Sequence, residues 1–210
     1  MTSLDNLTLP VRLRANEPGI LLIENFLSPE DCAELMNLSL PHLKPSMIYN
    51  SQTGSLEPST TRTSHGTFFD WGANAVVSRI EAKITNHFGY HLEQQECIQI
   101  QRYRVNQEYK PHWDYYQPHL GSDNAESLRN KGQRIATFLF YLQPAKQGGG
   151  TVFPEMGLHF TPKAGSLIYF ENIKQLPEDF ELQPLSLHGG VPVLEGEKWI
   201  ATKWIRQPKC

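Results

Sequence analysis

The stretch Tyr109-Lys110-Pro111-His112-Trp113-Asp114 determines how the rest of the sequence is interpreted. In an extended strand, side chains two residues apart point to the same face. His112 and Asp114 would therefore direct an imidazole and a carboxylate toward one point. They supply two groups of a 2-His-1-carboxylate metal site, which is typical of non-haem Fe(II). The second histidine must come from elsewhere in the chain, and His188 is the best candidate.

The composition of the chain excludes several classes of protein. The 210 residues predict one domain, and 39% hydrophobic residues are enough to build a core. The 19 Lys and Arg against 22 Asp and Glu give a net charge of −3, which argues against a nucleic-acid-binding arm or a polybasic membrane patch. No apolar run approaches the roughly 18 residues of a spanning helix, and residues 1–6 lack the charged, then apolar, then small-residue order expected of a secretory signal. Three scattered cysteines predict a cytoplasmic, reducing compartment.

The first part of the chain, residues 1–95, predicts supporting helices and strands. A short strand is expected around Val11–Arg14 and a buried strand over Ile20–Phe26. A helix from Ser28 to about Leu40 is indicated by serine at the N-cap, proline at the first position and acidic residues in the first turn. Apolar residues at helical spacing predict a second helix over Ala73–Phe88, with a glycine directly after it. Residues 44–67 are expected to form strands and loops, with a turn at 52–55.

The pattern changes at Glu96, after which short β-rich runs follow one another between turns that contain glycine or proline. This pattern is typical of an all-β barrel or sandwich, so residues 96–206 are predicted to be the core of a single domain over 1–210. The runs are Cys97–Tyr103, Tyr109–Tyr115, Arg134–Leu142, Thr151–Phe153, Ser166–Phe170, Ser186–His188 and Lys198–Arg206. The polar segment 117–132 is long for a loop in a compact domain, and such loops are often lids.

The residues after His188 predict a turn followed by a strand. Gly189-Gly190 allows a sharp turn, and Lys198 opens the last β-rich run, 10 residues beyond His188. By the period of two, Lys198, Ile200, Thr202, Trp204 and Arg206 share one face of that strand. A lysine beside a metal inside a barrel is a point charge suited to the far carboxylate of a bound acid.

Together these residues resemble the prolyl 4-hydroxylase branch of the Fe(II)/2-oxoglutarate dioxygenases. The resemblance covers roughly residues 20–206. It rests on His112-x-Asp114, His188 and Lys198, and on the runs Gln133–Leu142, Gly148–Pro154, Gly165–Phe170 and Ser186–Trp204, with Arg62-Thr63-Ser64 upstream. One departure is that Gly148-Gly149-Gly150-Thr151 lacks the acidic residue of the family's Gly-Gly-Glu-Thr.

The resemblance implies a double-stranded β-helix, or jelly roll, of mainly β (α+β) class, and a set of site residues. Fe(II) would be held by His112, Asp114 and His188. 2-Oxoglutarate would chelate the metal, pair with Lys198 and contact Tyr103 and Thr151, with O2 as the second substrate and ascorbate as the reductant. The resemblance also implies that Arg134 contacts the substrate, with a surface salt bridge as the alternative. Trp204 and Tyr115 are candidates for an aromatic groove that binds a proline-containing peptide, and the alternative is that they belong to the core and rim of the barrel.

The resemblance implies a prolyl residue in a peptide or protein as the target, and it allows for a homodimer. Two other hypotheses remain open. One is the same chemistry on a small molecule or another side chain. The other is a catalytically silent, peptide-binding sensor of iron and 2-oxoglutarate, which has no need of the full set His112, Asp114, His188 and Lys198. No nucleic-acid or membrane partner is expected.

Overall fold

Two antiparallel β-sheets face each other in the computed structural model, which describes residues 9–50, 55–117, 122–175 and 180–207. The large sheet has eight strands in the order β1-β2-β13-β9-β18-β7-β6-β3. Its strands are β1 (Val11–Asn16), β2 (Gly19–Ile23), β3 (Lys44–Pro45), β6 (His65–Phe69), β7 (Ile98–Tyr103), β9 (Arg134–Gln143), β13 (Leu167–Glu171) and β18 (Lys198–Arg206). This arrangement confirms the predicted mainly-β jelly-roll class.

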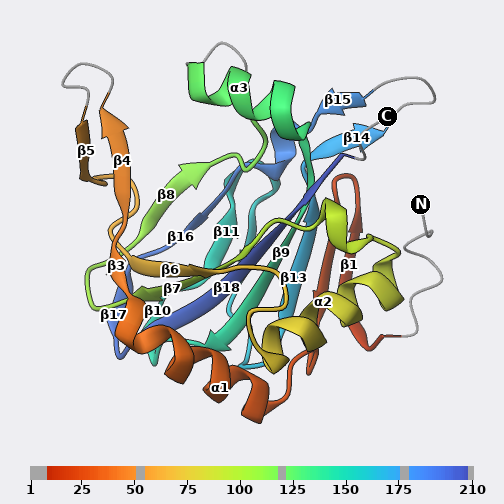
Figure 1. Ribbon diagram of the computed structural model, residues 1–210. Helices are drawn as coiled ribbons and strands as arrows, with labels where there is room; N and C mark the ends of the chain where they lie inside the picture. The colour runs from red at the N-terminus through yellow and green to blue at the C-terminus, as the bar shows by residue number, and fades with distance from the viewer. Residues whose placement is uncertain (1–8, 51–54, 118–121, 176–179, 208–210) are drawn as a thin grey trace.

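The small sheet has four strands in the order β12-β11-β16-β8. They are β8 (Tyr109–His112), β11 (Thr151–Phe153), β12 (Leu158–Phe160) and β16 (His188–Gly190). The other strands form three separate two-stranded sheets: β4 (Met47–Asn50) with β5 (Ser55–Pro58), β10 (Gln147–Gly148) with β17 (Val193–Glu195), and β14 (Ile173–Gln175) with β15 (Phe180–Leu182). In Figure 1 the small sheet lies on one side of β18, and helices α1 and α2 lie on the other.

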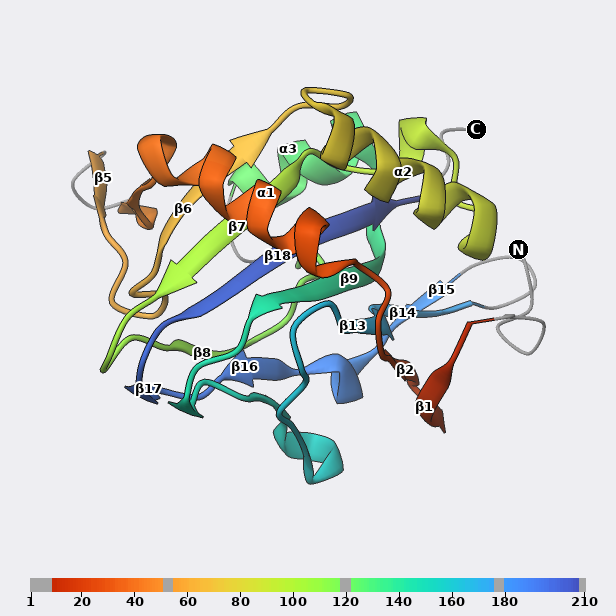
Figure 2. The same cartoon turned by 90° about the horizontal axis from the view of Figure 1, so that it is seen from below.

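The two helices that cover the large sheet lie within two residues of their predicted bounds. Helix α1 (Pro29–Ser39) starts at Ser28, whose hydroxyl accepts a hydrogen bond from the Asp31 amide at 3.1 Å. Helix α2 (Ala75–Phe88) starts at Asn74 and ends at Gly89, which adopts the left-handed conformation with φ of 74°. Figure 2 shows both helices lying across β7, β18 and β9.

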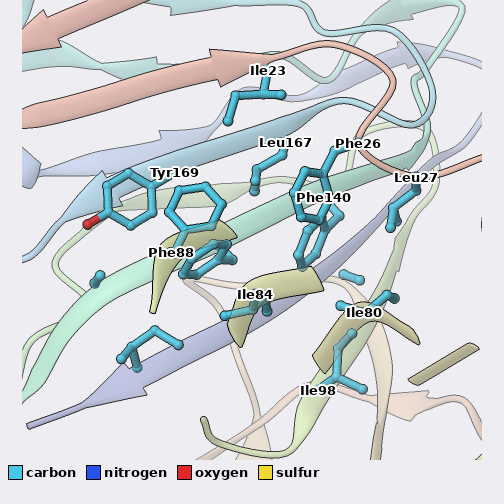
Figure 3. Packing of buried hydrophobic residues seen from close by; sticks show 14 of the residues in the cluster. Ile23, Phe26, Leu27, Ile80, Ile84, Phe88, Ile98, Phe140, Leu167 and Tyr169 are labelled. Carbon is cyan, nitrogen blue, oxygen red and sulfur yellow. The ribbon is translucent and has the colours of Figure 1, made fainter. Parts of the chain in front are cut away.

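The main hydrophobic core fills the space between these helices and the large sheet. Ile80, Ile84 and Phe88 of α2 are buried at helical spacing and pack toward the sheet (Figure 3). The ring of Phe88 lies edge-on to Phe138, with centroids 4.7 Å apart, and stacks on Tyr169 at 5.2 Å. The helices therefore cover one face of the large sheet, and the opposite face lies toward the small sheet.

Strand β18 separates these two environments because its side chains alternate between them. Lys198, Ile200, Thr202 and Trp204 line a pocket between the sheets, as the period of two predicts. On the opposite face, Trp199, Ala201 and Ile205 belong to the core beneath the helices.

Three local predictions of secondary structure were wrong. Strand β8 ends at His112, so Asp114 lies just beyond it. Gly189-Gly190 does not form a turn but belongs to β16, because Gly190 pairs with Thr151 on one side and Tyr109 on the other. The segment 117–132 was predicted to be a loop, but it contains helix α3 (Ser122–Lys131), which stands at the top of Figure 1. Its role as a lid stays a prediction.

The turn predicted at 52–55 falls largely on residues 51–54, which lie outside the described residues. Among the residues that the structure describes, no helix is long and apolar enough to cross a membrane.

Candidate metal centre and active site

The two predicted histidines are brought together by strand pairing in the small sheet. His188 of β16 and His112 of β8 are direct cross-strand partners. Asp114 follows two residues after His112. Its Oδ1 lies 3.6 Å from Nε2 of His112, and its Oδ2 lies 3.6 Å from Nε2 of His188. One ligand atom from each of the three residues falls within 4.8 Å of the others, so the trio is able to hold one metal ion.

Backbone carbonyls fix the tautomer of both imidazoles. Nδ1 of His112 lies 2.9 Å from the carbonyl of Lys110, and Nδ1 of His188 lies 3.0 Å from the carbonyl of Ser186. Since a carbonyl only accepts, Nδ1 must carry the proton in each ring. Nε2 therefore keeps its lone pair on the side facing Asp114, which is the arrangement that metal-binding histidines require.

The charge states of His188 and Asp114 also suit a metal. Burial lowers the pKa of His188 to about 4, so its imidazole is neutral at neutral pH. Burial alone would raise the pKa of Asp114, but the imidazoles of His188 and His112 and the nearby Arg134 hold it well below its usual range. Two neutral imidazoles and one carboxylate are the donor set that non-haem Fe(II) takes in a 2-His-1-carboxylate site.

The trio opens into a pocket of about 40 Å³ between the two sheets, with Lys198 in its wall. The side chain of Lys198 is buried, and its Nζ lies 3.5 Å from the carbonyl of Gly150. Burial lowers the pKa of the Lys198 amine to about 7. Among the residues that the structure describes, no carboxylate pairs with it. A buried amine without a counter-ion fits the carboxylate of a bound acid.

Hydroxyl groups gather around this amine. Nζ of Lys198 lies 5.6 Å from the ring of Tyr103 and 5.0 Å from the ring of Tyr141. The hydroxyls of Tyr141 and Thr151 lie 2.6 Å apart. Tyr103 and Thr151 were predicted to contact a cosubstrate, and the structure places both in the wall of the pocket. Tyr141 was not singled out, although alternation on β9 places it on the same face as Leu139, which lines the pocket.

Of the three residues predicted to contact the substrate, only Trp204 lines this pocket. Arg134 lies behind it. The guanidinium of Arg134 stacks on the indole of Trp204 at 3.8 Å and binds the carboxylate of Glu96 through two hydrogen bonds of 2.7 and 2.8 Å. Tyr115 is buried against Trp113, with ring centroids 5.8 Å apart.

Among the residues that contact the metal trio and that sequence reasoning missed are Tyr109 and Thr137. The ring of Tyr109 stacks on His112, with centroids 3.5 Å apart and planes inclined by 18°. The hydroxyl of Thr137 lies 2.8 Å from Oδ2 of Asp114. Tyr109 stands in the quoted stretch three residues before His112, but Thr137 comes from β9, and nothing in the local sequence connects it to Asp114.

Comparison with known proteins defines the class to which this fold and site belong. Residues 98–206, slightly more than half of the chain, match the family model described as the 2OG-Fe(II) oxygenase superfamily. This range contains all three residues of the candidate metal site and Lys198.

The particular family follows from the relatives. "Probable prolyl 4-hydroxylase 3" of Arabidopsis thaliana is 34% identical over 208 residues, which cover 90% of this chain and 69% of the relative. "Prolyl 4-hydroxylase 5" of the same plant is 36% identical over 207 residues, which cover 90% and 68%. The chain therefore belongs to the prolyl 4-hydroxylase family of the 2OG-Fe(II) oxygenases.

Solved structures agree with this assignment. The viral collagen prolyl hydroxylase vCPH from Paramecium bursaria Chlorella virus-1, in its 2OG complex, is similar with a TM-score of 0.69 and 29% identity, covering 90% of this chain and 96% of that one. A prolyl-4-hydroxylase from Pseudomonas putida shares the fold, with a TM-score of 0.59 and 18% identity, covering 91% and 94%.

Proposed function

We propose that this chain hydroxylates a prolyl residue in a peptide or protein. The overall reaction consumes one O2 and one 2-oxoglutarate, and it gives the hydroxylated residue, succinate and CO2. One oxygen atom enters the C–H bond of the substrate and the other enters succinate, so the oxidation of 2-oxoglutarate supplies the two electrons that the substrate alone does not.

The observation that carries this proposal is the meeting of four groups in one pocket. His112, Asp114 and His188 present their ligand atoms within 4.8 Å of one another, and the amine of Lys198, which has no carboxylate partner among the described residues, lies in the wall of the same pocket. A site that only bound a peptide would have no use for a buried amine without a counter-ion, because such an amine is costly to bury.

The proposed roles follow from this arrangement. His112, Asp114 and His188 would hold Fe(II), and Lys198 would pair with the far carboxylate of 2-oxoglutarate, with hydroxyls from Tyr103 and Thr151 beside it. Bound Fe(II) and 2-oxoglutarate supply the oxidising chemistry that no side chain provides. The protein orients the two reactants and keeps the surrounding pocket dry.

The substrate side of the proposal rests on Trp204. Its indole lines the pocket, and the Arg134 guanidinium braces it from behind, so the indole presents a rigid aromatic surface of the kind that binds proline-rich segments. Arg134 is already paired with Glu96 and would act mainly by holding Trp204. Tyr115 would contribute at the rim.

The test is a hydroxylation assay with Fe(II), 2-oxoglutarate, O2 and ascorbate as the reductant, with and without proline-rich peptides. We expect succinate release that the peptide stimulates, and a mass gain of one oxygen on proline. If the peptides do not stimulate succinate release, the result favours a small molecule or another side chain as the target. If iron-loaded protein releases no succinate, the catalytic proposal is refuted, and the hypothesis of a catalytically silent sensor of iron and 2-oxoglutarate remains.

Variants of the metal trio test the assignment of its residues. His188→Ala and Asp114→Ala are expected to abolish both iron binding and turnover, because each removes one of three ligands. Circular dichroism should show an unchanged fold, since the main hydrophobic core lies on the other side of β18. Substantial residual turnover in either variant would contradict the assignment.

The proposal includes a cytoplasmic location. Cys32 and Cys97 are free thiols, which is usual in a reducing compartment. It also includes a homodimer, which light scattering of the purified protein would test directly.

A further inference from the structure

A chain of buried hydrogen bonds runs from behind the pocket to the Asp114 carboxylate. Nδ2 of Asn172 lies 2.9 Å from Oγ1 of Thr137, and this hydroxyl lies 2.8 Å from Oδ2 of Asp114. Asn172 is 0% exposed and Thr137 1% exposed, so water does not compete for these bonds. The three residues come from separate parts of the chain: Asn172 directly follows β13, Thr137 lies in β9, and Asp114 lies in the segment after β8.

The chemistry of the groups fixes the direction of both hydrogen bonds. The ionised carboxylate of Asp114 only accepts, so the single hydroxyl hydrogen of Thr137 must point toward it. The hydroxyl oxygen is then left as an acceptor, and Asn172 must present its amide NH2 to it rather than its carbonyl oxygen. Asn172 therefore donates to Thr137, and Thr137 donates to Asp114.

The backbone of Asn172 is itself held from two sides. Its amide donates to the carbonyl of Ile135 at 2.9 Å, and its carbonyl accepts from the amide of Gln183 at 3.1 Å. The carbonyl of Gln183 accepts a hydrogen bond from the hydroxyl of Ser186 at 2.7 Å, and the backbone carbonyl of Ser186 accepts Nδ1–H of His188. Asn172 thus connects to Asp114 through its side chain and to His188 through its backbone.

We propose that Asn172 and Thr137 are positioning residues for the metal. Through its hydroxyl, Thr137 stops the Asp114 carboxylate from rotating about its Cβ–Cγ bond, and Asn172 keeps the hydroxyl in the donating orientation. This inference rests on the proposed function, because it takes Asp114 as a metal ligand. The binding energy of the metal then depends on a hydroxyl that never touches it, which is the usual effect of groups that orient metal ligands.

The test measures Co²⁺ affinity by visible absorbance on metal-free protein, with Co²⁺ as a stand-in for Fe(II) that does not oxidise in air. Thr137→Val keeps the shape of the side chain and removes only the hydroxyl. Asn172→Asp keeps its shape and replaces the donating NH2 by an acceptor. We expect each to weaken Co²⁺ binding roughly 10- to 100-fold, whereas Thr137→Ser should stay near the wild-type value because it keeps the hydroxyl.

A matched control removes a buried hydroxyl that has no connection to the site. Ser39 is 0% exposed and donates to the carbonyl of Leu35 at 2.6 Å in helix α1. Ser39→Ala should lower the melting temperature and leave Co²⁺ affinity unchanged. A loss of affinity confined to Thr137→Val and Asn172→Asp would therefore report positioning rather than general weakening of the fold.

The outcomes separate the two proposals. If wild-type protein binds Co²⁺, His188→Ala does not, and Thr137→Val binds within about threefold of wild type, the positioning role is refuted and the metal site stands. Equal losses in Thr137→Ser and Thr137→Val would also refute it, because the hydroxyl would not matter. If wild type itself binds no Co²⁺, or His188→Ala binds it equally well, the metal assignment fails first.

Discussion

The amine of Lys198 lies in an environment unlike that of an ordinary, solvent-exposed lysine. Its amine is buried beside the rings of Tyr103 and Tyr141, and burial lowers its pKa to about 7. In the free protein, the amine is therefore protonated below about pH 7 and loses its charge above it. A bound dianion would stabilise the protonated form and raise this pKa.

This shift predicts that 2-oxoglutarate binding depends on pH in one direction. Above pH 7, binding must bring a proton to Lys198, so the affinity should fall as the pH rises, by up to roughly tenfold per unit. Below pH 7 the amine is already charged, and this dependence should vanish. Equilibrium binding of 2-oxoglutarate to metal-loaded protein without O2, measured between pH 6 and 9, checks the prediction.

Lys198→Met provides the control for this measurement. The variant should bind 2-oxoglutarate more weakly at every pH, because it lacks the charge, and its affinity should no longer fall above pH 7. A wild-type affinity that stays constant up to pH 9 would show that Lys198 is not the group that meets the carboxylate.

At the scale of the element, β18 carries a second buried lysine on its opposite face. Nζ of Lys203 lies 2.6 Å from Oε1 of Glu81 in helix α2, and both side chains are buried. The other oxygen of Glu81 accepts from the amide of Gly72 at 3.1 Å, so the carboxylate also holds the loop before the helix. This pair joins α2 to the middle of the large sheet.

Removing one member of this pair should destabilise the protein strongly. Lys203→Met leaves the Glu81 carboxylate buried without its partner, which typically costs about 3–5 kcal/mol of the free energy of unfolding. Urea unfolding followed by circular dichroism measures the change. The double variant Lys203→Met with Glu81→Leu should recover part of the loss, since it removes the orphaned charge. A single variant as stable as wild type would contradict this account.

The sequence predicted those elements whose signals are local. Helices α1 and α2 were placed correctly because Ser28, Pro29 and Gly89 act within one turn of the helix ends. Helix α3 was missed because its polar sequence has no apolar stripe, and periodicity only detects helices that bury one face. Gly189-Gly190 was misread because its pairing partners lie far away in the sequence.

The same limit applies to the candidate site. The trio and Lys198 carry recognisable spacing, and the structure brings all four to one pocket. Thr137 and Asn172 carry none, because their roles arise only when β9 and β13 pair in the large sheet. The ion pair between Arg134 and Glu96 joins residues 38 positions apart, so the sequence did not indicate that Arg134 is already engaged.

For the whole molecule, a bound metal would act as a link between the two sheets. His112 and His188 belong to the small sheet, and Asp114 is hydrogen-bonded to Thr137 of the large sheet. Metal binding should therefore stabilise the folded chain as a unit. At a free metal concentration of 100 times the Kd, the gain is about 2.7 kcal/mol, which corresponds to a rise of roughly 5–10 °C in Tm.

Thermal unfolding with added Co²⁺ or with a chelator checks this prediction. Wild-type protein should melt at a higher temperature with the metal, and the chelator should reverse the shift. His188→Ala should melt at the same temperature in both conditions. A metal-induced shift of equal size in His188→Ala would place the stabilising site elsewhere.

The position of β18 in the large sheet has a consequence for how the chain is made. Strands β1, β2, β13 and β9 lie on one side of it and β7, β6 and β3 on the other, so β18 is what connects them. During translation, β9 and β7 each keep an unpaired edge until β18 has been synthesised and has left the ribosome. A nascent chain stalled before Lys198 should therefore be a target for chaperones and proteases rather than a partly active enzyme.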